Sequence, residues 1–318
     1  MKLNNVEKLN NIKIINIFII IGSIISILYI NYICYWKYFG LDNIIIVKPI
    51  LIHYLPINYI LILISFYNIS SSYVKKLLRK GFSIIDFKKL LFGIIDTSCS
   101  IYCKDNKYCI RLYSNDMTLH KIFSDMIYLV YGKKPMTFIT KNTYVTQLYG
   151  KNILMDIKNI KLDFDSKLKI EFVRTIMSGE GWITYSFVNS SLGFKIYPKL
   201  GFGSTIPYEK LSFYKNIICE TGINLNLKID KRYEKRGYLV TNNINDFKKF
   251  KEIGGFIEGI HIKKGIFKGI EKNSLLNLTL KLAKNSMNFS SKEEALNLIK
   301  NSCIDNDLKV YLYRIMLG

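Results

Sequence analysis

Two segments of the chain carry the residues with the clearest capacity for chemistry. Leu91–Cys99 reads LFGIIDTSC and Val173–Gly181 reads VRTIMSGEG, and each is a largely apolar run that ends in small and acidic residues. If two such segments pack together, the acids at their ends meet. A pair of carboxylates can hold divalent ions that activate water and stabilise the leaving oxygen of a phosphodiester. Mg²⁺ is suited to this role, since it binds one or two carboxylates together with phosphate oxygens and waters.

The two segments differ at the position of the acid. Glu180 is followed by Gly181 in the second segment, whereas Ser98 and Cys99 stand at the matching places in the first. Serine carries no charge at neutral pH and binds Mg²⁺ poorly. Loss of one carboxylate is expected to remove several kcal/mol of metal binding and transition-state stabilisation. Ser98 therefore stands opposite Glu180 at the paired segment ends, and the spacing predicts Glu180 as a metal-binding acid there.

The segment ends meet only if both segments are helices whose backbones approach closely. The apolar spacing predicts helices over 84–95 and 167–177. Small residues allow such an approach, and these are Gly93 in the first helix and Thr175 and Gly179 in the second. The acid positions then lie at adjacent helix ends, across a pseudo-two-fold axis.

A unit of helix, hairpin, helix, hairpin and helix occurs twice along the chain. After the first helix we expect strands over 100–103 and 108–113, a helix over 116–131, strands over 137–139 and 144–148, and a helix over 152–157. After the second we expect strands over 182–188 and 193–202, a helix over 208–221, strands over 225–229 and 237–241, and a helix over 245–251.

A repeat of this length predicts an α+β fold of two pseudo-symmetric subdomains rather than a solenoid. The expected subdomains are residues 81–165 and 166–271. A hydrophobic, helical N-terminal region, 1–80, precedes them, and a helical tail, 272–318, follows them. In the tail, Ser291 and Glu294 fit a capping box before an apolar face.

The two motifs and the repeated unit together resemble the LAGLIDADG homing endonucleases, in particular the archaeal-type monomers with two motifs. The resemblance covers residues 84–272. Besides the two helix ends, it includes the stretches Ser114-Asn-Asp116, Pro198–Ser204, Gly254–Gly259 and Gly269–Lys272. One motif alone would be weak, but two at matched positions of a repeated unit are fairly specific.

The resemblance implies an intron-encoded, Mg²⁺-dependent endonuclease as ancestor, acting as a monomer by its internal pseudo-symmetry. It implies that Glu180 and the residue at Ser98 are the metal-binding positions, and that Asp96 is structural and points elsewhere. The remaining motif positions are Gly93, Cys99, Gly179 and Gly181. Since Ser98 departs from the family pattern, nicking through Glu180 alone and loss of all cleavage are the alternatives.

The predicted hairpins carry basic and aromatic side chains. A two-stranded ribbon fits the major groove of B-form DNA, so two such hairpins would form a saddle over a duplex. The candidate nucleic-acid-binding residues are Lys104, Lys107 and Arg111 in the first repeat, and Tyr185, Lys195, Tyr197, Lys199, Lys231, Arg232, Lys235 and Arg236 in the second. The last four crowd one turn, where contact with phosphates is expected. For any single lysine a solvated surface is the alternative, and the concentration of charge on hairpins is what favours binding.

The chain as a whole is strongly basic. It has 46 Lys and Arg against 24 Asp and Glu, a net charge of +22. This excess favours phosphate backbones or an anionic membrane surface as partner. The abundance of Ile, Asn, Lys and Tyr is typical of A+T-rich genes, which suggests an intracellular protein of an A+T-rich organelle such as a mitochondrion, or of an archaeal cell. A zinc site is not expected, because there are three His and the six Cys form no Cys-x-x-Cys pair.

The N-terminal region contains a long apolar stretch. Residues 14–36 have no charge, and Tyr32, Tyr35 and Trp36 lie at one end, as in the aromatic belt of a membrane span. We interpret this stretch as a membrane anchor. The alternative is an unusually Ile-rich buried helix.

Residues 57–80 resemble the second half of a helix-turn-helix. Ser70 is expected to cap the helix and Gly81 to end it. The residues expected to face inward are Val74, Leu77 and Leu78, and those expected to face phosphates are Tyr73, Lys75, Lys76, Arg79 and Lys80. A basic helix beside a membrane span is the alternative.

Three functions follow as hypotheses. The leading one is a LAGLIDADG-type protein that binds double-stranded DNA, a nuclease by ancestry whose cleavage is placed in doubt by Ser98. The second is a non-catalytic RNA-binding protein, such as a splicing maturase or a recruited ribonucleoprotein component. The third is a membrane-bound structural subunit that has kept only the fold.

Overall fold

The computed structural model describes residues 69–104, 107–141, 143–191, 193–204, 206–230, 236–263, 267–283 and 288–301. The chain divides into two compact units, Met1–Ile69 and Ser70–Gly318. The predicted anchor, 14–36, lies outside the described residues, as do residues 57–68 of the segment that resembles a helix-turn-helix. Among the helices that the structure does describe, none combines the length and the apolar character that a membrane crossing requires.

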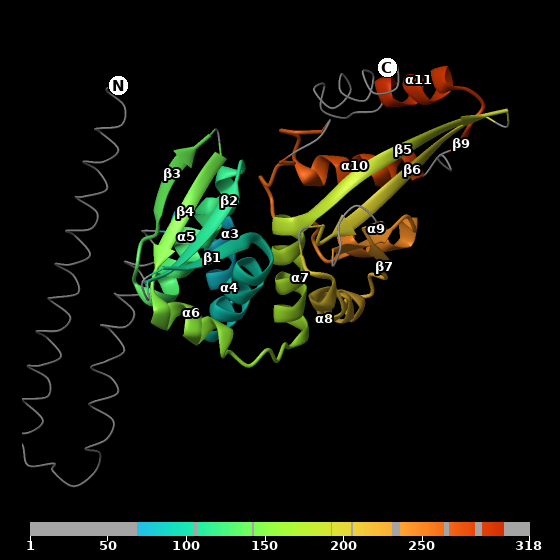
Figure 1. Ribbon diagram of the computed structural model, residues 1–318. Coiled ribbons are helices and arrows are strands. Elements are labelled where there is room, and N and C mark those ends of the chain that lie inside the picture. Colours follow the sequence, from blue (N-terminus) through green and yellow to red (C-terminus); the bar gives the residue numbers. More distant parts are fainter. Residues whose placement is uncertain are drawn as a thin grey trace, which may run out of the picture. The chain divides into compact units, whose positions relative to one another are not determined.

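The predicted repeat is present in the second unit (Figure 1). Its first copy consists of α4 (Ile84–Ser98), β1 (Cys99–Lys104), β2 (Lys107–Ser114), α5 (Met117–Tyr131), β3 (Met136–Thr140), β4 (Thr143–Tyr149) and α6 (Lys151–Lys158). Its second copy consists of α7 (Ser166–Glu180), β5 (Gly181–Ser190), β6 (Gly193–Phe202), α8 (Tyr208–Cys219), β7 (Asn226–Ile229), β8 (Gly237–Thr241) and α9 (Ile244–Glu252).

Each copy builds one antiparallel sheet with the same strand order. The orders are β1-β2-β4-β3 and β5-β6-β8-β7. The α+β class and the two similar subdomains are thus confirmed. The two motif helices, α4 and α7, are each 15 residues long and pack against one another. Both extend three residues beyond the predicted ends, so that Ser98 and Glu180 are their last residues.

One face of each sheet is covered by helices and forms the hydrophobic core. In the first sheet Ile110 and Leu112 are fully buried on this face, and in the second Leu200 and Phe202 are. Because side chains alternate along a strand, the residues between them lie on the opposite face. We call these opposite faces the first open face and the second open face.

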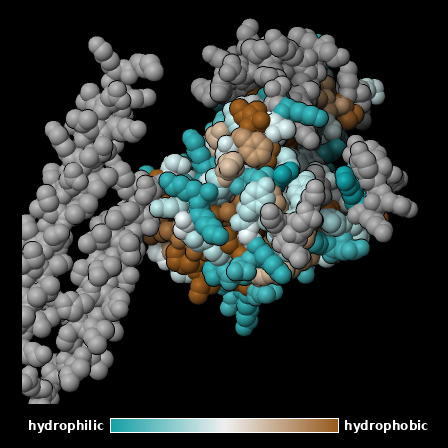
Figure 2. All heavy atoms as spheres, turned by 60° about the vertical axis from the view of Figure 1, so that its left-hand side comes forward, coloured by the Kyte–Doolittle hydropathy of each residue, from teal (hydrophilic) through white to brown (hydrophobic). Residues whose placement is uncertain are grey.

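The register defines the members of the two open faces. The first open face contains Ser100, Tyr102, Cys109, Arg111, Tyr113, Val145, Gln147, Tyr149, Met136 and Phe138, and the register continues it to Lys104, Lys107, Thr140 and Thr143. The second open face contains Trp182, Thr184, Ser186, Lys195, Tyr197, Lys199, Asn226, Lys228, Tyr238 and Val240. Figure 2 shows one side of the molecule, on which hydrophobic patches lie among hydrophilic ones.

The short helix α3 (Ser72–Arg79) precedes the first copy and corrects two predictions. Ser71 caps it, its hydroxyl accepting from the Val74 N–H, whereas Ser70 donates to Asp125. Tyr73, expected to face phosphates, is instead buried, and its hydroxyl hydrogen-bonds the side chains of Glu171 and Thr175 of α7. Val74 and Leu77 are buried as expected.

The segment after the repeats is less uniformly helical than expected. It forms α10 (Lys272–Ala283), β9 (Asn288–Phe289) and α11 (Lys292–Asn301). The strand β9 was not predicted, and it pairs with β6 through Phe194–Phe289 and Lys195–Asn288. The Ser291 cap is confirmed, since its hydroxyl accepts from the Glu294 N–H at 3.2 Å.

Candidate functional site

The contact between α4 and α7 depends on residues without bulky side chains. A Cβ atom on Gly93 would lie 2.9 Å from Ile176 Cγ2 and 2.9 Å from Phe172 Cε2. On α7, Thr175 is fully buried, and a Cβ atom on Gly179 would lie 2.5 Å from Ser98 Oγ. Gly93 and Gly179 are therefore where the two helices approach closely, and Ser98 rests against the residue that precedes Glu180, whereas the Thr175 hydroxyl lies 3.1 Å from the Tyr73 hydroxyl of α3.

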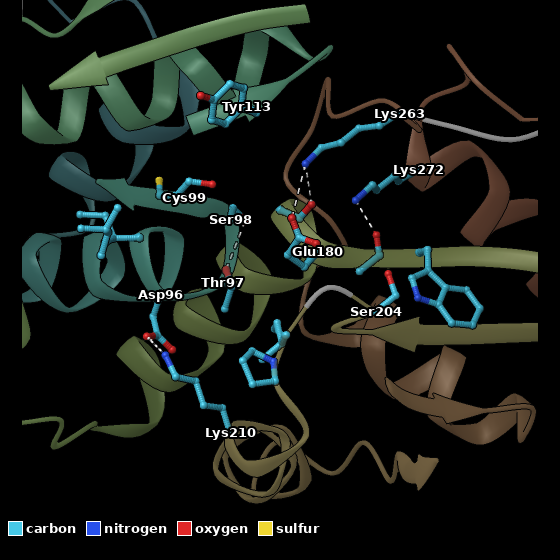
Figure 3. A pocket seen from close by; sticks show the side chains of 18 of the residues that line it. Asp96, Thr97, Ser98, Cys99, Tyr113, Glu180, Ser204, Lys210, Lys263 and Lys272 are labelled. Atoms are coloured by element: carbon cyan, nitrogen blue, oxygen red, sulfur yellow. Dashed lines mark hydrogen bonds and ion pairs between the residues drawn. The ribbon is translucent and has the colours of Figure 1, made fainter. Parts of the chain in front are cut away.

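The two helix ends open into one cavity of about 650 Å³ (Figure 3). Its walls come from the ends of α4 and α7, the first residues of β1 and β5, and the segments around Ser204, Lys210 and Lys263. Ser98 and Glu180 both line it. The structure thus brings together the two positions that sequence spacing matched, at one opening within the second unit.

Glu180 shares the cavity with a lysine that the sequence did not single out. Lys263 Nζ lies 3.7 Å from Glu180 Oε1 and donates to the Gly179 carbonyl at 2.9 Å. The Glu180 side chain is 15% exposed and that of Lys263 is 21% exposed. An ammonium group therefore stands close to the carboxylate, in the space that a metal ion bound to Glu180 would use.

A second lysine, Lys272, holds the turn between α7 and β5. Its ammonium donates to the Gly181 carbonyl at 2.6 Å and the Ser178 carbonyl at 2.8 Å, and it lies 3.4 Å from the Met177 carbonyl. The residue is only 4% exposed. Burial, with the charge of Lys263 added, lowers the pKa of Lys272 to about 7 even though Glu180 favours the charged form.

The lowered pKa of Lys272 predicts that stability depends on pH. In the unfolded chain this lysine titrates near 10.5, so between pH 7 and 10.5 the unfolded state binds more protons and stability rises with pH. Relative to Lys272→Met, which has no titrating group there, the natural chain is expected to gain about 3 kcal/mol from pH 7 to pH 9.5. Urea unfolding of both chains across this range measures the difference, and a constant difference would contradict the prediction.

The other motif residues have structural surroundings. Asp96 accepts from Lys210 Nζ and from the Tyr214 hydroxyl, both at 2.5 Å, so that its carboxylate is directed to α8, as the family resemblance implied. Burial raises the pKa of the Cys99 thiol, which keeps it protonated at neutral pH. At Gly181 an added Cβ would overlap the Met177 carbonyl oxygen, and this excludes any side chain there.

The donors around Glu180 do not fit a divalent ion. One carboxylate, one serine hydroxyl and a nearby ammonium are present, and the carboxylate of Asp96 is held by Lys210 and Tyr214. No group of three or more His, Cys, Asp or Glu suited to a metal exists in the part of the chain that the structure describes. The Mg²⁺ expected from the motif therefore lacks a second acidic ligand.

The predicted nucleic-acid-binding residues fall into three groups. Arg111, Lys195, Tyr197 and Lys199 lie on the open faces. Tyr185 does not, and its prediction as a binding residue was wrong: it is 6% exposed, lies on the helix-covered face and bonds Leu275 and Thr279 of α10. Arg236 is exposed beside β8, whereas Lys231, Arg232 and Lys235, and the side chains of Lys104 and Lys107, lie outside what the structure describes.

The second open face contains further residues that sequence reasoning missed. A hollow of about 390 Å³ on it is lined by Trp182, Thr184, Lys199, Lys228 and Tyr238, among others. Trp182 packs on Gly201, which leaves no room for a side chain at that glycine. Side-chain alternation along β5 and β7 places Trp182 and Lys228 on the open face. This could have been deduced from the sequence only if the helix-covered face had been known.

Comparisons with known proteins give matches among solved structures. No family model matches the chain, and no curated protein matches it. The LAGLIDADG meganuclease I-AabMI bound to uncleaved DNA is 14% identical over 67% of this chain and 97% of that chain, with a TM-score of 0.45. A mesophilic variant of the homing endonuclease I-DmoI is 14% identical over 53% and 90%, with a TM-score of 0.41.

The N-terminal LAGLIDADG domain of WhiA also matches, with 15% identity over 61% of this chain and 88% of that chain and a TM-score of 0.41. Two of these structures, I-AabMI and the WhiA domain, are LAGLIDADG proteins, the family that the two motifs of this chain resemble. At such identities and TM-scores nothing about activity follows from the similarity.

Proposed function

We propose that this chain is a monomeric LAGLIDADG-type protein that binds double-stranded DNA and does not cut both strands. The observation that supports this most directly is the equivalence of Ser98 and Glu180. Each is the last residue of a 15-residue helix, the two helices pack together, and both residues line the same cavity. The fold thus retains the arrangement of a paired acidic site, but only one of the two acids is present.

The second open face supports binding to a phosphate backbone. Lys195, Lys199 and Lys228 extend from three positions on the strands of one sheet, with Tyr197 between the first two. Lysine ammonium groups attract phosphates and displace the counterions of a duplex, which accounts for most of the affinity of non-specific DNA binding. The net charge of +22 contributes long-range attraction.

The surroundings of Glu180 support loss of double-strand cleavage. In-line cleavage of two strands by metal-activated water requires charge at both helix ends. Here Ser98 contributes no charge, and the ammonium of Lys263 lies 3.7 Å from the remaining carboxylate. The protein thus supplies its own cation at Glu180. A cation fixed in this way can pair with a phosphate oxygen, but it cannot generate hydroxide.

The proposal predicts salt-sensitive duplex binding that depends on the second open face. Fluorescence anisotropy of the full chain with a random 30-bp duplex, from 50 to 300 mM KCl, should give a steep linear fall of log K with log[KCl]. The variant Lys195→Glu/Lys199→Glu should lose at least about tenfold in affinity and lower the slope by about two. Plasmid incubated with Mg²⁺ should yield no linear product.

The matched control is Lys248→Glu/Lys251→Glu, which makes the same charge change at exposed positions of α9. It should lower the affinity only slightly. Equal losses in both variants would show that only net charge acts and would reject the second open face as the site. Preference for structured RNA would favour the ribonucleoprotein alternative, and weak binding to both nucleic acids would favour the membrane-bound structural one.

A further inference from the structure

The first open face differs in chemistry from the second. Large aromatic and apolar side chains are exposed on it: Tyr149 is 56% exposed, Tyr102 47%, Tyr113 37%, Phe138 37% and Met136 67%. An exposed cluster of this kind on a protein surface marks a binding site. Among the described side chains of this face Arg111 is the one cation, and no carboxylate is present.

The register spreads the rings evenly over the sheet. Tyr102 and Tyr149 both flank Cys109 in one row, and Tyr113 and Phe138 both flank Val145 in another. The row between them contains Arg111, paired with Ser100 and Gln147. Alternate residues of a strand are about 6.8 Å apart, so the four ring-bearing residues lie in the rows on either side of the Arg111 row.

Arg111 is held in place at the centre of this cluster. Its Nε donates to Gln147 Oε1 at 2.7 Å, and its guanidinium carbon lies 5.1 Å from the centre of the Tyr102 ring. Its NH1 lies 3.5 Å from the Tyr113 hydroxyl. A guanidinium fixed by its neighbours offers a planar, positively charged surface at little entropic cost, and such planes stack on bases as aromatic rings do.

We propose that the first open face binds unpaired bases of a single-stranded nucleic acid, which stack on Tyr102, Tyr113, Phe138, Tyr149 and the plane of Arg111. Stacking is tolerant of base sequence and adds affinity through the rings themselves, whereas non-specific affinity for a duplex comes from cations. A face with four exposed rings around Arg111 is suited to bases, and the lysines of the second open face are suited to duplex phosphates.

The position of this face relative to the cavity supports the same occupant. Tyr113 belongs to the first open face and also lines the cavity that contains Ser98 and Glu180, as Figure 3 shows. The Tyr113 side of the face therefore borders a cavity that Lys263 and Lys210 also line. An apolar protein partner would gain nothing from those cations. The inference rests on the proposed function only in assuming that the chain binds nucleic acid.

The test compares a single strand with a duplex at 100 mM KCl, where binding of both is measurable. Anisotropy of labelled dT20 and of a 20-bp duplex is measured with the full natural chain and with Phe138→Leu/Tyr149→Leu, which keeps apolar area but removes two rings. We expect affinity for dT20 to fall at least about tenfold and affinity for the duplex to change less than about twofold.

The matched control, Tyr128→Leu/Phe213→Leu, removes one tyrosine and one phenylalanine from α5 and α8 and should change neither affinity. Unchanged dT20 affinity in a folded Phe138→Leu/Tyr149→Leu chain would overturn the proposal, as would equal losses on single strand and duplex. Failure of the duplex proposal is separate, because it would appear as a duplex affinity of Lys195→Glu/Lys199→Glu equal to that of its charge-matched control, whatever the affinity for dT20.

A second measurement uses the natural chain and does not depend on the folding of a variant. Ultraviolet cross-linking of dT20 that contains 5-iodouracil should attach the strand to peptides from β1–β4. Cross-links confined to peptides of β5–β8 would contradict the proposal.

Discussion

Ser98→Asp is expected to give the chain Mg²⁺-dependent DNA cleavage. The substitution places a second carboxylate at the last residue of α4, the position equivalent to Glu180 at the end of α7. The cavity of about 650 Å³ has room for the longer side chain. Two carboxylates at adjacent helix ends can share divalent ions with phosphate oxygens, and the ion then supplies hydroxide and stabilises the leaving oxygen.

The expected gain is large both in Mg²⁺ affinity and in cleavage activity. Recovery of several kcal/mol of metal binding corresponds to an increase of about 10²–10³-fold in Mg²⁺ affinity. Calorimetric titration with Mg²⁺ measures this directly, and nicking or linearisation of supercoiled plasmid measures the activity. Ser98→Asn is the matched control, because it has nearly the shape of aspartate without its charge, and Ser98→Asp/Glu180→Gln should again be inactive.

A second substitution, Lys263→Met, determines how a negative result with Ser98→Asp is interpreted. If Ser98→Asp binds Mg²⁺ no better than Ser98→Asn, the ammonium at 3.7 Å from Glu180 excludes the ion. Adding Lys263→Met should then restore binding. Absence of Mg²⁺ affinity in a folded Ser98→Asp/Lys263→Met chain would contradict the equivalence of the two helix ends.

Gly93→Val is expected to destabilise the fold by about 2 kcal/mol. A Cβ atom added at Gly93 would lie 2.9 Å from both Ile176 and Phe172, which are fully buried, and valine would add two methyl groups beyond it. Overpacking of a well-filled core costs about 1–3 kcal/mol, and the helix propensity gained on replacing glycine, under about 1 kcal/mol, offsets only part of it. The α4–α7 contact would have to open.

Thermal and urea unfolding of the two chains measure this cost. Ser212→Val, at an exposed position inside α8, controls for the intrinsic effect of valine in a helix and should change stability by less than about 0.5 kcal/mol. The cost of Gly93→Ala should also be smaller in an Ile176→Ala background, because that change removes one of the two obstructing side chains. If Gly93→Ala were as destabilising in the Ile176→Ala background as in the natural chain, the clash would not involve Ile176.

Secondary structure was the part of the molecule most accessible from sequence. Period-two alternation and turn residues located each hairpin, and the matched spacing of Ser98 and Glu180 identified the equivalent helix ends. The helix ends themselves were placed three residues early, since Thr97, Ser98 and Gly179 are poor helix formers whose conformation is set by the packing of α4 on α7.

Contacts between distant segments were not accessible. Lys263 and Lys272 are two of 46 basic residues, and their place at the end of α7 depends on the path of the chain after α9. Tyr185 was assigned to the binding surface by its hairpin alone, although alternation with Ile183 puts it on the covered face. Tyr73 was misplaced because a buried partner, Glu171, satisfies its hydroxyl.

The turns after the two motif helices tolerate change to different degrees. Cys99 has a side chain at the first residue of β1, whereas the equivalent Gly181 can have none, because a Cβ atom there would overlap the Met177 carbonyl. Substitutions at Gly181 are therefore expected to be rejected, whereas position 99 accommodates a side chain. In a mutational scan we therefore expect substitutions at Cys99 to be accepted more often than substitutions at Gly181.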